Sequence, residues 1–386
     1  MSAKSLLKDR SAIVGIGQTN FGKGMPQSEE ELGAMAIMAA LNDAGIKPSE
    51  VDGLCSYTTQ TAEEEEIARA SGFGDLRFFA RVPAGGGGGC STIGLGAMAI
   101  ATGQADVVVA YRSRKRSGRA SRVWSQTQEY VKGRYQWTTP YGLHRPSDEV
   151  GMVMRRQMYE HGATRDHLAN IALAFRAHAN RNPVAVMGAK TLTREQYMAA
   201  RWISEPLCLF DCCIETDGAL AVGMVSAERA RDLPQPPAYV HAFAQGLTRD
   251  SNMMSNFFCE DPLLTQGEAC ASALWAASDF KAKDVDVAQF YDAFTPLVLQ
   301  SLEAFGFCGR GESGAFTENG NLALGGQLPS NTSGGSLSEV YAHGFNLIIE
   351  AVRQIRGTST AQVPDVKCSF VASSNCVPTG ALVLRK

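Results

Sequence analysis

The chain has 386 residues, of which 45% are hydrophobic and 19% are charged, a balance typical of a soluble globular protein with a large buried core. The formal net charge of −3 argues against nucleic-acid binding and against a membrane-surface role, since both favour an excess of basic residues. The sequence contains no run of about 18 apolar residues, so no membrane-spanning helix is expected.

The ten cysteines are scattered along the chain and form no C-x-x-C pair, so neither a disulfide framework nor a zinc site is indicated. The first residues, MSAKSLLKDRSAIVGIG, are too polar for a secretory signal. We therefore expect reduced thiols, no metal site and a cytoplasmic protein.

The first predicted elements are a strand over 11–17, a helix over 29–46 and a strand over 51–57. Five glycines then lead into Cys90 and a helix of small residues, followed by the apolar strand 107–111. Small side chains let a helix approach its neighbours closely, so this helix is expected in the middle of the molecule.

The region from about 112 to 205 differs in character, because it is polar and rich in arginine. It reads as an inserted loop and helical region that covers the core, and a strand pattern returns over 208–226. The Pro-rich stretch 232–239 marks a boundary, so we expect an N-terminal half over 1–236 and a C-terminal half over 237–386.

The second half repeats the pattern of the first. LNDAGIKPSEVDGLCSY, 41–57, has a counterpart in ASDFKAKDVDVAQFYDA, 277–293. The glycine run and the helix after Cys90 have a counterpart in NTSGGSLSEVYAHGFNLIIEAVRQIRG, 331–357. Two βαβ-type halves of one design indicate a layered α/β core with a pseudo-twofold axis and sites between the halves.

Four motifs resemble the thiolase superfamily, and the likeness covers nearly the whole chain. They are GGGGGCSTIGLGAMAI at 85–100, YDAF at 291–294, NTSGGSLSEVYAHG at 331–344 and NCVPTGALVL at 375–384. The resemblance implies a duplicated five-layer α-β-α-β-α fold. It also places Cys90 at the nucleophile position and Cys376 at the position of the second cysteine.

Departures from those motifs point to one subfamily of the thiolase superfamily. Tyr341 stands where a thiolase has its catalytic histidine, Tyr291 stands at the asparagine or histidine position, and Asp292 replaces the glutamate. These departures, together with the stretch ARWISEPLCLFDCCIETDGA at 200–219, resemble one subfamily: the lipid-transfer-protein-type, sterol-carrier-protein-X-like proteins of bacterial steroid catabolism. Some members of this subfamily are steroid side-chain aldolases. The resemblance implies an acyl-CoA substrate, a homodimer, a small OB-fold partner and no cofactor apart from the coenzyme A that the substrate carries.

The implied reaction is retro-aldol cleavage of a β-hydroxyacyl-CoA into a ketone and a short acyl-CoA, with Tyr291 and Tyr341 as base and acid. A phenol titrates near about 10, so a tyrosine base needs a nearby donor, a cation or a helix N-terminus. Ser336 and Glu339 form a capping-box signature after the Gly334–Gly335 turn, which predicts a helix start beside Tyr341.

Each candidate also has a plain structural interpretation. Tyr341 fits an apolar helical stripe with 345, 348, 349 and 352, and Tyr291 could be an ordinary strand-end tyrosine. Cys90 is either a reactive thiol, since its place before a helix favours reactivity, or an unreactive residue that lines the pocket. His343 could have a binding or orienting role in the site, although on an ideal helix its side chain faces away from that of Tyr341.

Substrate binding is expected at Gly334, Gly335, Cys376 and Arg114. Arg114 belongs to a basic run that could meet the phosphates of coenzyme A or an acidic partner, or be a solvated loop. Cys212 and Cys213 are predicted to pack in the core, and Glu215 to serve a turn or a subunit interface.

Two other functions stay open. One is a β-ketoacyl-CoA thiolase that uses Cys90 as acyl carrier, with His343 as a possible base. The other is a non-catalytic acyl-CoA-binding subunit. Dependence on free coenzyme A separates a thiolase from an aldolase.

Overall fold

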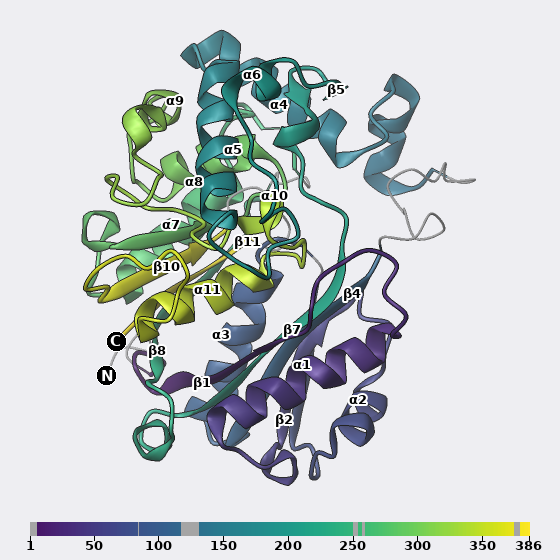
Figure 1. Ribbon diagram of the computed structural model, residues 1–386, viewed down its shortest axis with the longest axis vertical. Helices are drawn as coiled ribbons and strands as arrows, with labels where there is room; N and C mark the ends of the chain where they lie inside the picture. The colour runs from purple at the N-terminus through teal and green to yellow at the C-terminus, as the bar shows by residue number, and fades with distance from the viewer. Residues whose placement is uncertain (1–5, 84, 117–130, 250–253, 257–258, 374–378) are drawn as a thin grey trace.

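The computed structural model describes residues 6–83, 85–116, 131–249, 254–256, 259–373 and 379–386 (Figure 1). Nine strands form one mixed sheet in the order β3-β2-β4-β7-β1-β8-β11-β10-β9. The first-half strands are β1 (Ser11–Gln18), β2 (Gly53–Tyr57), β3 (Phe78–Val82), β4 (Val107–Lys115) and β7 (Asp217–Ser226). The second-half strands are β8 (Ala238–Gly246), β9 (Val287–Phe290), β10 (Cys368–Ala372) and β11 (Thr379–Arg385).

The strand order repeats outward from the middle of this sheet. One half runs β1-β7-β4-β2 and the other runs β8-β11-β10-β9. In each half the first two pairings are antiparallel and the third is parallel. The halves meet where β1 and β8 pair over two positions, at Ala12 and Ile13. This repetition confirms the duplicated α/β core that the sequence pattern predicts.

Helices form layers on and between the two halves of the sheet (Figure 1). The outer helices are α1 (Glu29–Ala44) and α2 (Glu64–Ser71) on the first half, and α7 (Gln266–Ala277) and α8 (Thr295–Ala304) on the second. The central layer contains α3 (Gly88–Ala101) and α11 (Phe345–Arg356), each of which contacts strands of both halves. The five-layer arrangement is therefore as predicted.

Small residues explain how α3 fits into the central layer. A Cβ built at Gly94 would overlap the ring of Phe243 on β8, and one at Gly96 would lie 3.1 Å from the sulfur of Met224 on β7. Only a helix without side chains at these positions can pack this closely against both halves. The predicted central position of this helix is confirmed.

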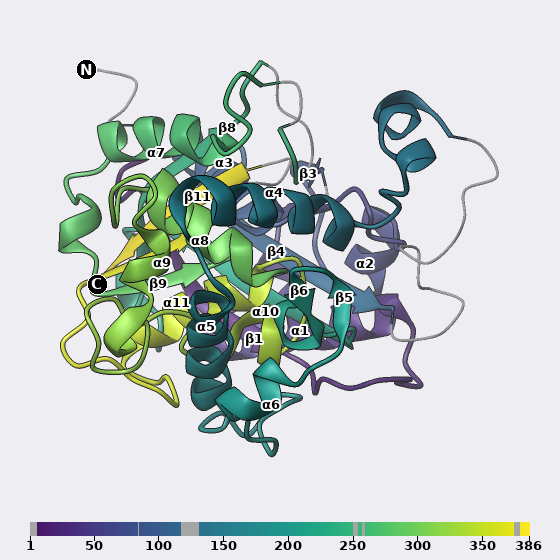
Figure 2. The same cartoon turned by 90° about the horizontal axis from the view of Figure 1, so that it is seen from above.

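A helical layer covers the second half (Figure 2). It contains α4 (Pro146–His161), α5 (Arg165–Ala179) and α6 (Arg194–Met198), and the pair β5 (Trp202–Ser204) and β6 (Leu207–Cys208) follows. Two short helices, α9 (Ser313–Phe316) and α10 (Gly335–Ser338), complete the described α-helices. The stretch from 112 to 115 belongs to β4, where it pairs with β7.

None of the helices in the described part of the chain combines the length and apolarity that a membrane crossing requires. The same residues contain no group of three or more histidine, cysteine, aspartate or glutamate side chains that could hold a metal ion.

Candidate active site

Two tyrosines from separate parts of the second half meet at one point. Tyr291 follows β9, and its N–H donates to the carbonyl of Ala372 at 2.8 Å. Tyr341 lies in the loop between α10 and α11, where its N–H donates to Thr216 Oγ1 at 3.0 Å. The two hydroxyl oxygens are 3.0 Å apart, a hydrogen-bonding distance. The convergence that an aldolase mechanism requires is present.

The helix expected at Ser336 differs from the prediction. The helix there, α10, is one short turn, and Gly334 precedes it with a φ of 109°. The carboxylate of Asp292 accepts the N–H of Ser336 at 2.8 Å and that of Leu337 at 3.2 Å. The predicted Ser336–Glu339 capping box is wrong, because Asp292 takes that role from across the fold.

Tyr341 therefore lies outside both neighbouring helices, because α10 ends at Ser338 and α11 begins at Phe345. The helical stripe that would have made it a core residue begins only after it. A helix start is thus not what stabilises a phenolate here, and the site needs another source of positive charge.

Gly334 and Gly335 allow the chain to turn closely at the start of α10. A Cβ at Gly335 would overlap the Asp292 carboxylate, and one at Gly334 would lie 2.6 Å from Cβ of Ala179 on α5. Burial raises the pKa of Asp292 to about 6, and the N–H groups of α10 oppose that rise. The structure gives both glycines a packing role, whereas their substrate-binding role stays a prediction.

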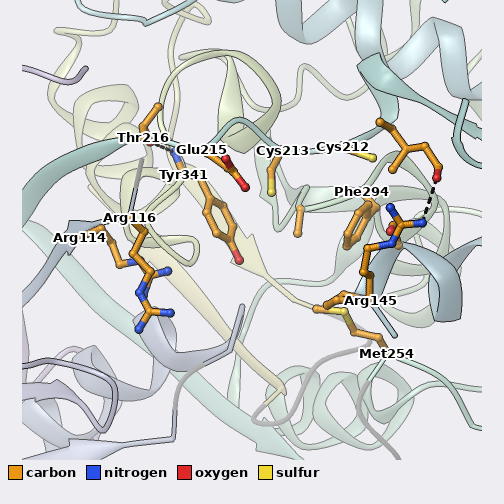
Figure 3. Close-up of a pocket in the computed structure, with 14 residues that line it drawn as sticks. Arg114, Arg116, Arg145, Cys212, Cys213, Glu215, Thr216, Met254, Phe294 and Tyr341 are labelled. Atoms are coloured by element: carbon orange, nitrogen blue, oxygen red, sulfur yellow. Dashed lines mark hydrogen bonds between the residues drawn. The ribbon is translucent and has the colours of Figure 1, made fainter. Parts of the chain in front are cut away.

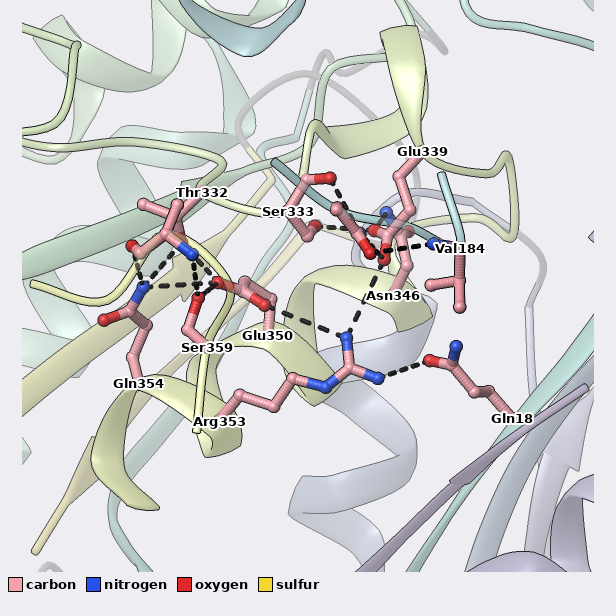
Figure 4. A network of polar contacts seen from close by, with 12 residues as sticks. Gln18, Val184, Thr332, Ser333, Glu339, Asn346, Glu350, Arg353, Gln354 and Ser359 are labelled. Atoms are coloured by element: carbon pink, nitrogen blue, oxygen red, sulfur yellow. Dashed lines mark hydrogen bonds and ion pairs between the residues drawn. The ribbon is translucent and has the colours of Figure 1, made fainter. Parts of the chain in front are cut away.

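A buried polar network holds the two ends of the Tyr341 loop (Figure 4). Glu339 accepts hydrogen bonds from Ser333 at 2.6 Å and from Asn346 at 3.1 Å. Arg353 of α11 lies 3.9 Å from Glu339 and from Glu350. Burial raises the pKa of Glu339 to about 7, while Arg353 opposes this. The network joins the start of the loop to the first turns of α11.

The network also reaches the first half, because Arg353 donates to the side chain of Gln18 on β1 at 2.5 Å. Glu350 accepts hydrogen bonds from Thr332 and Ser359, both at 2.6 Å. The Tyr341 loop is thus tied to both halves of the molecule.

His343 lies next to Tyr341 in space as well as in sequence. The two rings are perpendicular with centroids 5.1 Å apart, and His343 has a φ of 49°. Arg112 Nη2 is 3.0 Å from His343 Nδ1. Because arginine only donates, Nδ1 must accept, which fixes a neutral ring protonated at Nε2. Burial and then the charge of Arg112 hold the pKa of His343 well below its ordinary value.

The basic run that begins at Arg112 is not a solvated loop in its first part, since Arg112 is fully buried and Arg114 is 2% exposed. Arg112 donates to Gln60 at 2.6 Å and to Thr59 at 2.9 Å, and its guanidinium lies over the ring of Tyr57. The later residues of the run, 119 and 122, lie outside the described residues.

Cys90 is the third residue of α3 and is 2% exposed. Its thiol lies 3.8 Å from the carbonyl of Val371, and burial raises its pKa. Desolvation outweighs the effect of the helix start, so the place of Cys90 at the beginning of α3 does not lower the pKa of its thiol. Whether Cys90 reacts stays a prediction, and Cys376 lies outside the described residues.

A pocket opens beside Tyr341 (Figure 3). Its described lining includes Arg114, Arg116, Arg145, Cys212, Cys213, Glu215, Thr216, Met254, Phe294 and Tyr341. The residues from 212 to 216 connect both tyrosine loops, since Cys213 N–H donates to Ala293 at 2.8 Å and Ile214 N–H donates to Ser336 at 3.1 Å. Cys212, Cys213 and Glu215 therefore line the site, a role that sequence reasoning missed.

The sequence did indicate that this segment matters, because the motif DCCIETDGA at 211–219 is part of the stretch that carries the family resemblance. Asp211, at the start of this segment, is buried and accepts hydrogen bonds from Tyr197 and Thr295. The following residues emerge from the core toward the tyrosines, and periodicity alone does not show such a change.

Comparisons with known proteins show the family of the chain. The family described as Thiolase, N-terminal domain matches residues 11–192, and Thiolase C-terminal domain-like matches residues 250–383. A steroid side-chain-cleaving aldolase of Thermomonospora curvata is 45% identical over 98% of this chain and 99% of its own. A 17-hydroxy-3-oxo-4-pregnene-20-carboxyl-CoA lyase of Mycobacterium tuberculosis is 44% identical over 98% of this chain and 100% of its own.

Among solved structures, one described as an Ltp2-ChsH2(DUF35) aldolase superposes with a TM-score of 0.93 at 43% identity, covering 99% of both chains. The layered duplicated fold and these full-length similarities agree. The chain belongs to the thiolase family and, within it, to the steroid side-chain-cleaving aldolases.

Proposed function

We propose that this chain cleaves the bond between Cα and Cβ of a β-hydroxyacyl-CoA with a steroid side chain, giving a ketone and a short acyl-CoA. The observation that carries the proposal is the 3.0 Å contact between the hydroxyls of Tyr291 and Tyr341 at the pocket. The two full-length relatives named as steroid side-chain aldolase and lyase support it.

The reaction needs one base and one acid, and two phenols supply both. A phenolate takes the proton of the β-hydroxyl, and the electrons of the breaking bond pass to the thioester as an enolate while the hydroxyl carbon becomes the ketone. A tyrosine hydroxyl then protonates Cα of the enolate, which restores the starting charge. Hydrogen bonding between the two hydroxyls lets either ring fill either role.

The acyl-CoA thioester brings its own coenzyme A, so no resident cofactor is invoked. A second pocket adjoins the first and shares Arg145, Cys212, Cys213 and Glu215 with it. Lys23, Arg176, Lys190 and Arg201 add positive charge there, which suits the phosphates of coenzyme A. Arg114 belongs to the lining of the first pocket, beside Tyr341, rather than to this second one.

The name of the solved relative includes a DUF35 component, and we propose that this chain likewise works with a small OB-fold partner of that kind. We also propose a homodimer joined through β3, because β3 is an edge strand of the sheet and its Phe79 is 63% exposed.

The test is co-expression with a DUF35-type protein, followed by incubation with 17-hydroxy-3-oxo-4-pregnene-20-carboxyl-CoA and detection of the released ketone. We expect ketone release without added free coenzyme A. Turnover that requires free coenzyme A and a β-ketoacyl-CoA would instead identify a thiolase that uses Cys90. Binding of both thioesters without any product would identify a non-catalytic subunit.

A further inference from the structure

Arg114 occupies an unusual place for a charged residue. It lies on β4 two positions after Arg112, so both side chains point to the same face of the sheet. Its partner on β7 is Gly218, just after the segment that lines the pocket. The side chain is 2% exposed and lines the pocket together with Tyr341 and Thr216, as Figure 3 shows.

The charge of Arg114 is only partly satisfied by the fold. Within the described residues, its Nη1 has no hydrogen-bond partner, although this atom is buried. The terminal nitrogens of Arg112, by contrast, donate to Gln60, Thr59 and His343, and its Nε is the atom that lacks a partner among the described residues. A buried guanidinium nitrogen without a partner is costly, and such groups are retained where function requires them.

Other charges near the tyrosines come from several elements. Arg116 lines the pocket from the end of β4, and Glu215 lines it from the segment before β7. Asp292 follows Tyr291 but is turned to the N–H groups of α10. Glu29 of α1 accepts backbone N–H groups of Thr61 and Lys115.

The neutral groups around the tyrosines complete this environment. His343 is uncharged beside Tyr341, and the buried Cys90 thiol and the Tyr57 hydroxyl both have raised pKa values. None of these three groups adds positive charge to the site. Among the described residues, Arg114 is the buried cation in the pocket lining.

We propose that Arg114 supplies the positive charge that lets the Tyr291–Tyr341 pair hold one phenolate at neutral pH. This inference rests on the proposed function and gives it the stabilising group that the helix start does not provide. Burial and then the charge of Arg116 lower the pKa of Arg114, and electrostatic attraction to Tyr341 and Tyr291 opposes that fall. The same attraction must favour the ionised phenol.

The proposal also accounts for the rest of the cycle. The negative charge begins on a phenolate, moves to the substrate alkoxide when the proton transfers, and then to the thioester enolate when the carbon–carbon bond breaks. Protonation of Cα by the tyrosine returns the charge to the phenolate. One fixed cation can therefore balance a single negative charge at every stage, without reorganising.

The experiment compares Arg114→Gln with Arg69→Gln in the complex with the DUF35-type partner. Ketone release is followed as kcat/KM against pH, and tyrosinate is followed by its near-ultraviolet absorbance. We expect Arg114→Gln to move the ascending limb of the profile up by about one to three pH units, with about tenfold lower activity at neutral pH for each unit. Arg69→Gln, which removes an exposed charge on α2, should leave that limb in place.

A second variant keeps the test decisive if Arg114→Gln does not fold. Arg114→Lys retains the charge only below the pKa of the new amine, which burial lowers. Its activity should fall again at alkaline pH, where the natural chain retains activity. The tyrosinate absorbance at neutral pH should be lost in Arg114→Gln and retained in Arg114→Lys.

An unchanged ascending limb in Arg114→Gln, with only KM raised, would overturn the inference and leave Arg114 as a substrate-binding residue. So would a lysine variant whose profile matches the natural one at alkaline pH. Both outcomes differ from failure of the proposed function, which appears as no ketone release by the natural complex.

Discussion

Cys90 and Tyr341 each follow a glycine turn in corresponding parts of the two halves, yet only one of them faces the pocket. The Cys90 thiol is buried on α3 against the carbonyl of Val371. Tyr341 lies outside any helix and places its hydroxyl against that of Tyr291. The two turns thus place the residues that follow them in different surroundings, and we propose that the reactive group comes from the second half.

The glycine turn before Cys90 lies close to two aromatic rings. A Cβ built at Gly86 would overlap the ring of Tyr291, and one at Gly88 would lie 2.5 Å from the ring of Tyr57. The turn next to Cys90 therefore packs against aromatic rings, one of which belongs to the site. Four variants test this contrast between a packing role for Cys90 and a chemical role for the tyrosines.

Removing either phenol hydroxyl should have the largest effect. Tyr291→Phe and Tyr341→Phe each remove a proton-transfer group but keep the ring, so ketone release should fall by about 100-fold to 10,000-fold. The measurement is kcat for ketone formation by the complex, with substrate binding followed separately. Tyr159→Phe is the control, because this ring is 86% exposed on α4. Full activity of both site variants would contradict the proposed mechanism.

Filling the space under Tyr291 should come next. In Gly86→Ala the new methyl group must displace the Tyr291 ring, which separates the two hydroxyls. Misplacement by about 1 Å can cost about 100-fold, and we expect a loss of about that order in kcat. Gly223→Ala on β7 is a matched control, since a Cβ there meets no atom within 4 Å. Equal activity of the two variants would show that Gly86 does not position Tyr291.

Sequence patterns predicted the layered fold because its strands and helices have strong periodicity and its halves repeat. They also identified Tyr291 and Tyr341, through motif positions rather than through physical pattern. They could not show that Asp292 caps α10, because this carboxylate comes from 44 positions earlier in the chain. A cluster of arginines is typical of solvated surface, so only the structure shows that Arg112 and Arg114 are buried.

A variant of Glu339 tests how firmly the buried polar network holds the Tyr341 loop. Burial raises its pKa to about 7, above the ordinary value of 4.5, so between these values the folded chain binds a proton that the unfolded chain has lost. The free energy of unfolding must then fall as pH rises through this window, by at most about 1.4 kcal/mol per pH unit. Glu339→Gln should reduce that slope, measured by urea unfolding at several pH values.

The control for this prediction is Glu65→Gln, which changes an exposed carboxyl of α2 and should leave the slope unchanged. Asp292 contributes a slope of the same sign, because burial raises its pKa to about 6, so part of the dependence should persist in Glu339→Gln. A slope identical to that of the natural chain would mean that Glu339 is ionised throughout, balanced by Arg353.

Cys90→Ala should have the smallest effect, although a thiolase mechanism predicts the largest effect for this residue. A thiol whose pKa is raised by burial is a poor nucleophile, and retro-aldol cleavage needs no covalent intermediate. Truncating a small buried side chain should cost about 1 kcal/mol of stability and change kcat for ketone release by less than about threefold. A loss as large as that of Tyr341→Phe would instead show that Cys90 takes part in the chemistry. The comparison between the two glycine turns would then reverse, with the thiol forming the bond and the tyrosines only shaping the pocket around it.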